Sequence, residues 1–264
     1  MIALCNGLDV AYDDVGTGMP VVFVHGFPHN RTLWMPQLGA LVDRARCLAP
    51  DLRGFGDTAP RAPYSMDQYA DDLAGLLDVL RVERVVLCGL SMGGYATLAF
   101  WRRHRDRVRA LVLCDTRAEA DDADGRARRD DMIALARKKG VEAVARALMQ
   151  GMIGRSTRER HPGVVDAVYS MLAAAPIDGV VGALEAMRDR PDSEATLATI
   201  DVPTLIVVGE EDAITPPDRS RAMHAAIAGS RLEVIAGAGH VSSVERPAAF
   251  NHVLSEFLAA VDYE

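Results

Sequence analysis

The sequence has few cysteines, no long apolar run and no excess of basic residues. Its four cysteines lie far apart and form no Cys-x-x-Cys pair, which favours reduced thiols in a cytoplasm over a disulfide framework. No stretch reaches the roughly 18 uninterrupted apolar residues of a membrane span, and residues 1–10 lack the features of a secretion signal. We therefore expect a soluble, cytoplasmic protein without a membrane partner.

The charge balance is acidic, with 29 Lys and Arg against 37 Asp and Glu and a net charge of −8. Nucleic acid is therefore not an expected partner, because phosphate contacts need a clustered basic face. The sequence also has no internal repeat, no low-complexity segment and no G-x-G-x-x-G or phosphate-binding loop. We accordingly expect no nucleotide cofactor, and we assign no residue to a cofactor or to a metal.

The 264 residues, 49% of them apolar, are enough for one large domain or for a core domain that carries an insertion. Short runs rich in Val, Leu and Ile alternate with segments of helical periodicity. Such apolar runs are typical of strands that are covered on both faces. We expect strands at 21–24, 46–49, 85–87, 110–113, 205–208 and 232–235, and helices at 66–80, 94–104, 219–227 and 247–261. This alternation predicts a parallel sheet flanked by helices, an α/β fold.

The alternation stops between residues 117 and 199. This segment opens with a charged run at 121–131 and continues as helical segments separated by glycines and prolines, without a convincing strand. We predict a helical insertion at 117–199 between the two parts of the core, 1–116 and 200–264. Five of the eleven methionines fall in the insertion, and their adaptable side chains suit either ordinary helix packing or a wall around apolar ligands.

A G-x-S-x-G motif, from Gly89 to Gly93, follows one expected strand and precedes an expected helix. In that setting the chain turns sharply, with strained backbone angles at the serine and glycines that allow close approach of neighbouring segments. The turn would expose the Ser91 hydroxyl at a helix N-terminus, where negative charge is stabilised. Ser91 is therefore the candidate nucleophile, and the alternative is an ordinary serine in a glycine-rich turn.

A nucleophilic serine needs a base, and His240 is the candidate. It follows the small-residue loop 236–239, at the carboxyl end of an expected strand, where open α/β sheets bind their ligands. His25 and His29 also flank a loop at a strand end, and sequence position does not exclude them. Four histidines are expected to be solvated or capping residues: His104, His161, His224 and His252.

The acid that orients the base is expected between the serine and the histidine in the chain. Asp212, in a loop after the strand at 205–208, is the preferred candidate. Glu210 and Glu211 in the same loop stay open as alternatives, although they are expected to face solvent. Asp115 is the rival, because it ends the strand that precedes the insertion, near Ser91.

An acyl-transfer site also needs donors for the oxyanion that forms during attack. The backbone amide of Met92, directly after the nucleophile, is one candidate. The other is the amide of Phe27, in the loop 25–28 that follows the first expected strand. The alternative is an ordinary His-Gly turn in which Phe27 only fills the core.

With these residues in place, the chain resembles the α/β-hydrolase superfamily. The resemblance implies a mostly parallel sheet flanked by helices, and it implies that 117–199 is a helical cap that roofs the site and sets substrate preference. It also implies that 51–56 is a structural loop near the pocket. The motifs that carry it are His25-Gly26-Phe27-Pro28, Asp51-Leu52-Arg53-Gly54-Phe55-Gly56, residues 89–94, Gly209-Glu210-Glu211-Asp212 and Gly237-Ala238-Gly239-His240.

Within the superfamily, residues 94–100 and 114–118 resemble 3-oxoadipate enol-lactonases, small carboxylesterases and cofactor-free haloperoxidases. The resemblance implies a serine hydrolase that cleaves esters or lactones, with a small molecule as its partner. A serine in the motif disfavours dehalogenase and epoxide-hydrolase activity. Perhydrolysis, C–C bond hydrolysis and ligand sensing without turnover stay open, as do the natural substrate, the pocket-lining residues of the cap and the oligomeric state.

Overall fold

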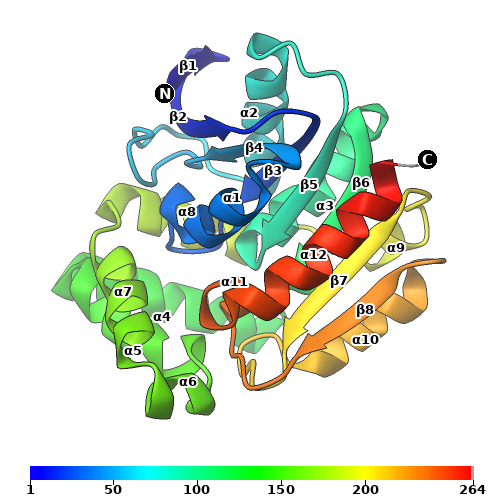
Figure 1. The fold of residues 1–264 in the computed structure, drawn as a ribbon. Helices are drawn as coiled ribbons and strands as arrows, with labels where there is room; N and C mark the ends of the chain where they lie inside the picture. The colour runs from blue at the N-terminus through cyan, green and yellow to red at the C-terminus, as the bar shows by residue number, and fades with distance from the viewer. Residues whose placement is uncertain (263–264) are drawn as a thin grey trace.

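A computed structural model describes residues 1–262 and contains a single eight-stranded sheet (Figure 1). The spatial order of the strands is β1-β2-β4-β3-β5-β6-β7-β8, with β1 and β2 antiparallel to their neighbours and the other pairs parallel. The strands are β1 (Ile2–Cys5), β2 (Leu8–Val15), β3 (Met19–Val24), β4 (Ala45–Pro50), β5 (Val85–Leu90), β6 (Val108–Cys114), β7 (Thr204–Gly209) and β8 (Arg231–Ile235).

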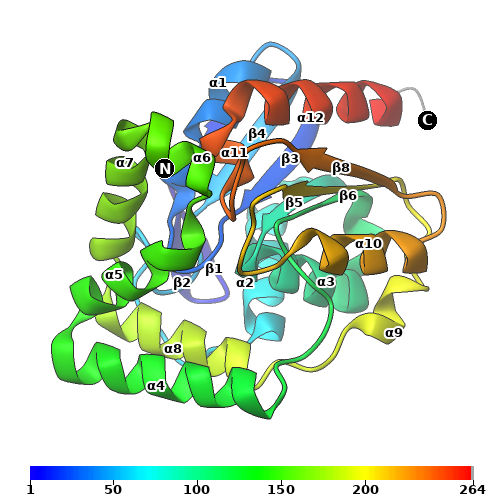
Figure 2. The same ribbon diagram turned by 90° about the horizontal axis from the view of Figure 1, so that it is seen from below.

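Helices cover both faces of this sheet, as Figure 2 shows. One face carries α1 (Met35–Leu41), preceded by the 3-10 turn η1 (Arg31–Trp34), and the C-terminal α12 (Pro247–Asp262). The opposite face carries α2 (Met66–Val79), α3 (Met92–His104), which leads into the turn η2 (Arg105–Arg107), and α10 (Pro217–Ala226). Large buried clusters lie on each side of the sheet, so its central strands are covered on both faces, as the unbroken apolar runs predict.

The segment between β6 and β7 is helical in the structure. The helices are α4 (Ala123–Lys139), α5 (Val141–Met152), α6 (Arg155–Arg160), α7 (Pro162–Ala173), α8 (Ile177–Arg188) and α9 (Glu194–Leu197). In Figures 1 and 2 its green and yellow-green helices, α4 to α8, lie beyond the carboxyl ends of the strands, whereas the yellow α9 lies beside α10.

Each of the six strands expected from the apolar runs is present, but one interpretation of them is wrong. The run at 232–235 is not covered on both faces: it forms the edge strand β8, which pairs only with β7, and Val234 is 40% exposed. The β1–β2 hairpin at the opposite edge was not expected from the sequence. Its first strand alternates between exposed and buried residues, so it contains no continuous apolar run.

All four cysteines are buried and free. The Cys88 and Cys114 sulfur atoms lie 3.8 Å apart in neighbouring strands without a disulfide. Among the helices of residues 1–262, none is by itself both long and apolar enough to cross a membrane, and only α7 and α8 together, bent by 93°, reach that length.

Candidate active site

Ser91 lies at the turn between β5 and α3. Its backbone angles, φ 55° and ψ −112°, fall in a region that non-glycine residues rarely occupy, which marks stored strain. The turn is possible because of its glycines: a Cβ on Gly89 would lie 2.4 Å from the Gly93 carbonyl oxygen, and one on Gly93 would lie 2.2 Å from the Val24 carbonyl oxygen. The strained turn predicted from the G-x-S-x-G spacing is therefore present.

The structure brings Ser91, His240 and Asp212 together from three distant parts of the chain. The Ser91 Oγ lies 2.8 Å from the His240 Nε2, and the His240 Nδ1 lies 2.8 Å from Asp212 Oδ2. Because the carboxylate accepts at Nδ1, that nitrogen carries the proton and Nε2 is free to accept the serine proton. All three side chains are almost entirely buried at the carboxyl ends of β5, β7 and β8.

Four donors hold the Asp212 carboxylate in place. Besides the imidazole, the Thr215 hydroxyl donates to Oδ2 at 2.7 Å, and the Ile214 and Thr215 amides donate to Oδ1 at 2.8 and 2.9 Å. Burial opposes ionisation of Asp212, but His240 and these donors hold the pKa of the carboxyl below its usual range. The sequence analysis did not predict this role for Thr215. An Asp side chain that accepts hydrogen bonds from residues shortly after it in the chain is nevertheless a common feature of turns.

The electrostatics of His240 follow from the same contact. Burial works to lower the pKa of His240, yet the charge of Asp212 and its hydrogen bond outweigh burial and raise that pKa above its ordinary value. A raised pKa makes the imidazole a stronger base toward the serine hydroxyl.

The loop 25–28 lies beside the serine. A Cβ on Gly26 would be 3.3 Å from the Ser91 Cβ, so the loop approaches the turn as closely as a glycine permits. Within residues 1–262, the amides of Phe27 and Met92 donate to no protein acceptor. Two free amides on segments that flank a serine hydroxyl are what an oxyanion site requires.

His25 has a structural position. Its Nδ1 donates to the Gly26 carbonyl oxygen at 2.8 Å, and its Nε2 accepts from the Leu52 amide at 3.0 Å. The ring also meets Phe55 edge-on, with centroids 5.5 Å apart, and Phe55 meets Phe27 at 6.2 Å. These contacts tie the loop 51–56 to the loop 25–28.

Asp115 forms no hydrogen bond with His240. Its Oδ1 accepts from the Gly209 amide at 2.8 Å, while its Oδ2 accepts from the Ser242 hydroxyl at 2.6 Å and the Ser242 amide at 3.3 Å. Burial and the neighbouring Asp212 raise the pKa of this carboxyl. Of the two candidate acids, Asp115 therefore braces the loops that carry the imidazole and its carboxylate partner.

A third buried carboxylate at the site, Glu245, was missed because nothing in its local sequence marks it. Its Oε1 accepts from the amides of Gly239 and Val241 at 2.9 and 3.3 Å, on either side of His240. Its Oε2 accepts from the Gly154 amide at 3.0 Å, so one side chain joins the His240 loop to the helical segment.

None of the remaining candidates forms a hydrogen bond with the Ser91 hydroxyl or the His240 ring. His29 is buried, and neither of its ring nitrogens has a hydrogen-bond partner within residues 1–262. Glu210 faces solvent as expected, whereas Glu211 does not: it is half-buried and accepts from the Ser156 amide and hydroxyl at 2.8 and 2.6 Å. The half-buried or exposed histidines are His104, His161, His224 and His252.

Comparison with known proteins decides the family. A family model described as the alpha/beta hydrolase fold matches residues 19–247. The chain belongs to the α/β-hydrolase family. This assignment confirms the fold predicted from the ordered motifs.

Relatives of this α/β-hydrolase include several kinds of enzyme. An esterase from Thermogutta terrifontis is 38% identical with a TM-score of 0.96, covering 99% of this chain and 98% of the esterase. The enol-lactonase from Burkholderia xenovorans LB400 is 31% identical with a TM-score of 0.91, covering 98% of this chain and 100% of the lactonase. The 2-hydroxy-6-oxo-2,4-heptadienoate hydrolase of Pseudomonas putida is 33% identical, covering 99% of this chain and 96% of the relative.

Proposed function

We propose that this α/β-hydrolase cleaves carboxylic esters or lactones through an acyl-enzyme on Ser91. The observation that carries the proposal is the continuous chain of contacts from the Ser91 Oγ through the His240 imidazole to Asp212, with 2.8 Å at each junction. The esterase and the enol-lactonase, which cover nearly the whole chain, support the ester and lactone classes.

In this mechanism Ser91 attacks the substrate carbonyl while its proton passes to the His240 Nε2. The charge that develops on the carbonyl oxygen is stabilised by the amides of Phe27 and Met92. Protonated His240 then delivers the proton to the leaving alcohol, and Asp212 stabilises the imidazolium. In the second half, His240 takes a proton from a water molecule that attacks the acyl carbon. The bond between this carbon and the Ser91 Oγ then breaks, His240 returns the proton to Oγ, and the acid leaves.

The helical segment 117–199 is the proposed cap of this site. The position of its helices α4 to α8 beyond the strand ends (Figure 1) and the contacts of the segment with the His240 loop support that role. Besides the Glu245 bridge, the His240 amide donates to the Met152 carbonyl oxygen at 3.1 Å. A cap that binds the loop of the general base shields the acyl-enzyme from bulk water.

A cytoplasmic location stays a prediction, supported by the four free cysteines.

The test is labelling with a fluorophosphonate followed by peptide mapping, together with a panel of acyl esters and lactones of varied length. We expect a stable adduct on Ser91 and turnover of at least one ester or lactone. An adduct on a different residue, or full ester turnover by a Ser91→Ala variant, would contradict the proposal.

C–C bond hydrolysis is the alternative activity, and the Pseudomonas putida relative favours it. It uses the same three residues, so labelling alone does not separate the two. Cleavage of a 2-hydroxy-6-oxo-dienoate at least as fast as the best ester in the panel would assign C–C bond hydrolysis in place of ester hydrolysis.

Perhydrolysis, in which peroxide takes the place of water, would be revealed by peroxide-dependent bromination of a reporter in acetate.

A further inference from the structure

Glu245 ends the short helix α11 (Ser242–Glu245), which follows the proposed base His240 in the chain. The residue is buried, with 3% of its surface exposed. Within residues 1–262, every hydrogen bond that its carboxylate accepts comes from a backbone amide, and no cationic side chain pairs with it. Buried charges in proteins are ordinarily paired, so the negative charge of Glu245 is left to act on its surroundings.

The Glu245 carboxylate joins both neighbours of His240 to the helical segment. Its Oε1 accepts from the Gly239 amide at 2.9 Å and from the Val241 amide at 3.3 Å. Its Oε2 accepts from the Gly154 amide at 3.0 Å. Three N–H donors suit an ionised carboxylate, which only accepts hydrogen bonds. One side chain therefore fixes the peptide groups on both sides of the imidazole.

The helical segment and the His240 loop meet backbone against backbone at this point. A Cβ on Gly239 would lie 2.2 Å from the Gly154 amide nitrogen, and a Cβ on Gly154 would lie 2.8 Å from the Gly239 amide nitrogen. The His240 amide also donates to the Met152 carbonyl oxygen at 3.1 Å. Because two glycines allow this close approach, a displacement of residues 152–154 would displace His240 as well.

Three carboxylates from three parts of the fold act on the His240 imidazole. Burial lowers the pKa of the imidazole, and the carboxylates raise it: Asp212, Asp115 and Glu245. Burial and the neighbouring Asp212 raise the pKa of Asp115, which favours the neutral form of that carboxyl. The other imidazole that interacts with His240, that of His29, has its pKa lowered to about 3 by burial and is neutral. Besides Asp212, Glu245 is therefore the carboxylate that can stabilise the imidazolium.

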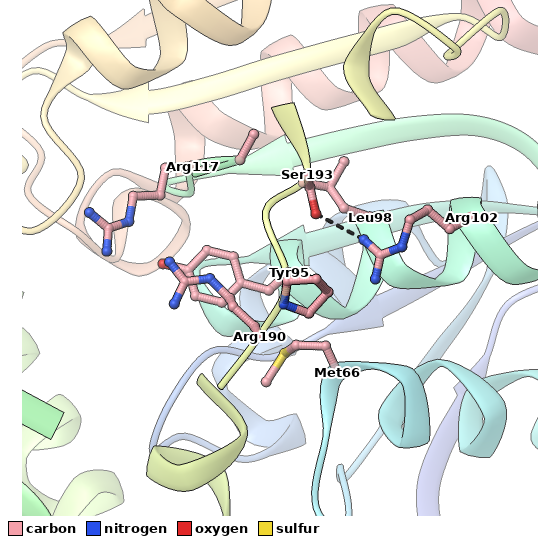
Figure 3. A pocket seen from close by; sticks show the side chains of 9 residues that line it. Met66, Tyr95, Leu98, Arg102, Arg117, Arg190 and Ser193 are labelled. Carbon is pink, nitrogen blue, oxygen red and sulfur yellow. Dashed lines mark hydrogen bonds between the residues drawn. The ribbon is translucent and has the colours of Figure 1, made fainter. Parts of the chain in front are cut away.

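The helical segment is also anchored to the core at a second place, which Figure 3 shows. The Arg190 guanidinium lies against the ring of Tyr95, a residue of α3, with its carbon 4.1 Å from the ring centroid. One of its terminal nitrogens donates to the Glu119 carbonyl oxygen at 2.7 Å. These contacts hold the two ends of the segment 117–199, whereas Glu245 holds its middle. A variant of Glu245 should therefore keep the segment on the core.

We propose that Glu245 is a positioning residue for the general base: its carboxylate fixes the His240 loop against the helical segment and stabilises the imidazolium that forms when Ser91 loses its proton. Asp212 sets the tautomer of the imidazole through a direct hydrogen bond. Glu245 acts through the two peptide groups that flank the imidazole and through its charge. The proposal rests on the proposed function and adds one residue to its mechanism.

The experiment measures kcat and KM of Glu245→Gln for a p-nitrophenyl ester across the pH range in which imidazole titrates. Glutamine is similar in size but neutral, and its NH₂ group must face either the Gly154 amide or the two amides beside His240. We expect kcat to fall about tenfold with little change in KM, as for the loss of one charge-assisted hydrogen bond. The loss of activity at acid pH should have its midpoint about half a pH unit lower than in the unmodified enzyme, because a negative charge that favours the imidazolium is gone.

Two further variants separate charge from position. Glu211→Gln is the matched control, because Glu211 also binds the helical segment, accepting from the Ser156 amide and hydroxyl at 2.8 and 2.6 Å, but accepts from neither neighbour of His240. It should change neither kcat nor the midpoint. Glu245→Asp keeps the charge on a side chain that is one methylene shorter, so we expect an unchanged midpoint and a loss of about threefold in kcat.

Unchanged kcat and midpoint in folded Glu245→Gln protein would overturn the proposal. An equal shift of the midpoint in Glu211→Gln would also overturn it, because that result indicates a general effect of net charge. If Glu245→Gln fails to fold, as judged by thermal unfolding, undiminished kcat in Glu245→Asp would overturn it.

An NMR titration of the His240 imidazole in Ser91→Ala protein separates this inference from the proposed function, because the titration needs no turnover. A lower imidazole pKa after Glu245→Gln is added to Ser91→Ala would support the proposal even if fluorophosphonate failed to label Ser91 in the unmodified enzyme. An equal imidazole pKa in the two proteins would refute it.

Discussion

Replacing Asp212 with asparagine should remove almost all activity without unfolding the protein. The Asn oxygen can still accept from the amides of Ile214 and Thr215, now 2.8 and 2.9 Å from Oδ1. The new NH₂ group would then face the His240 Nδ1, where the carboxylate now accepts at 2.8 Å. Since two donors cannot face each other, the imidazole moves its proton to Nε2 and can no longer accept the Ser91 proton.

The size of the activity loss in Asp212→Asn follows from the shift of the His240 proton from Nδ1 to Nε2. In serine proteases the same change lowers kcat about 10⁴-fold, which is about 5.5 kcal/mol of transition-state stabilisation. Asp115→Asn is the matched comparison, because it removes an equally buried carboxylate from the same region while leaving the contact between His240 and Asp212. We expect a loss of about tenfold or less, together with about 2 kcal/mol of stability from the weakened bonds to Gly209 and Ser242.

The assay is kcat/KM for a p-nitrophenyl ester near pH 8, with urea unfolding of each variant to correct for folded protein. A larger loss in Asp115→Asn than in Asp212→Asn would refute the reasoning and assign the acid to Asp115. Equal, small losses in both would show that neither carboxylate sets the tautomer of His240.

Three further changes have definite outcomes. His240 must be neutral to accept a proton, and its pKa is raised. In a pH profile of kcat/KM, the loss of activity at acid pH should therefore have its midpoint above the ordinary imidazole value of about 6.5. A midpoint below that value would contradict the raised pKa of His240. Burial lowers the pKa of His29 to about 3, so folding excludes a proton that the unfolded chain binds, and stability is lost as pH falls below about 6.5. His29→Leu should therefore add about 2 kcal/mol near pH 5 and less near pH 8 in urea unfolding, and an equal gain at both would disprove this linkage. Gly93→Ala places a Cβ 2.2 Å from the Val24 carbonyl oxygen and should cost more than about 3 kcal/mol, measured by thermal unfolding, whereas wild-type stability would show that the turn is not tightly packed.

The sequence was sufficient to predict the central part of the fold because buried parallel strands leave a strong local signal. Val85 to Leu90 is buried at every position, and such a run between a loop and a G-x-S-x-G turn has few other interpretations. The positions of Ser91, Asp212 and His240 could be inferred for a related reason. Each follows the carboxyl end of such a strand, and the carboxyl ends of parallel strands meet at one edge of the sheet.

The edges of the sheet were harder to predict. In β1, Ile2 and Leu4 are exposed while Ala3 and Cys5 are buried, which is the period of two expected for a half-covered strand. The turn after it, Asn6-Gly7, has φ of 52° and 76° and is a common hairpin signal. This pattern was available in the sequence and could have been recognised.

Other features depend on tertiary contacts that local sequence does not reveal. Glu245 accepts a hydrogen bond from the amide of Gly154, which lies 91 residues away in the chain. No sequence spacing predicts that contact. The ion pairs of Asp121 are similar, since its partner Arg190 is distant from it in the chain. Part of the charged run at 121–131 lines a cleft in the structure, and the composition of the run gave no sign of that.

An acyl-enzyme on Ser91 is detected by quenching the enzyme during turnover of p-nitrophenyl acetate and mapping the bound acetyl group by mass spectrometry. We expect one acetyl group on the peptide that contains Ser91, which disappears on further incubation and is absent from the Ser91→Ala variant. Turnover with no acetyl group on that peptide, or persistent turnover by Ser91→Ala, would contradict the acyl-enzyme mechanism.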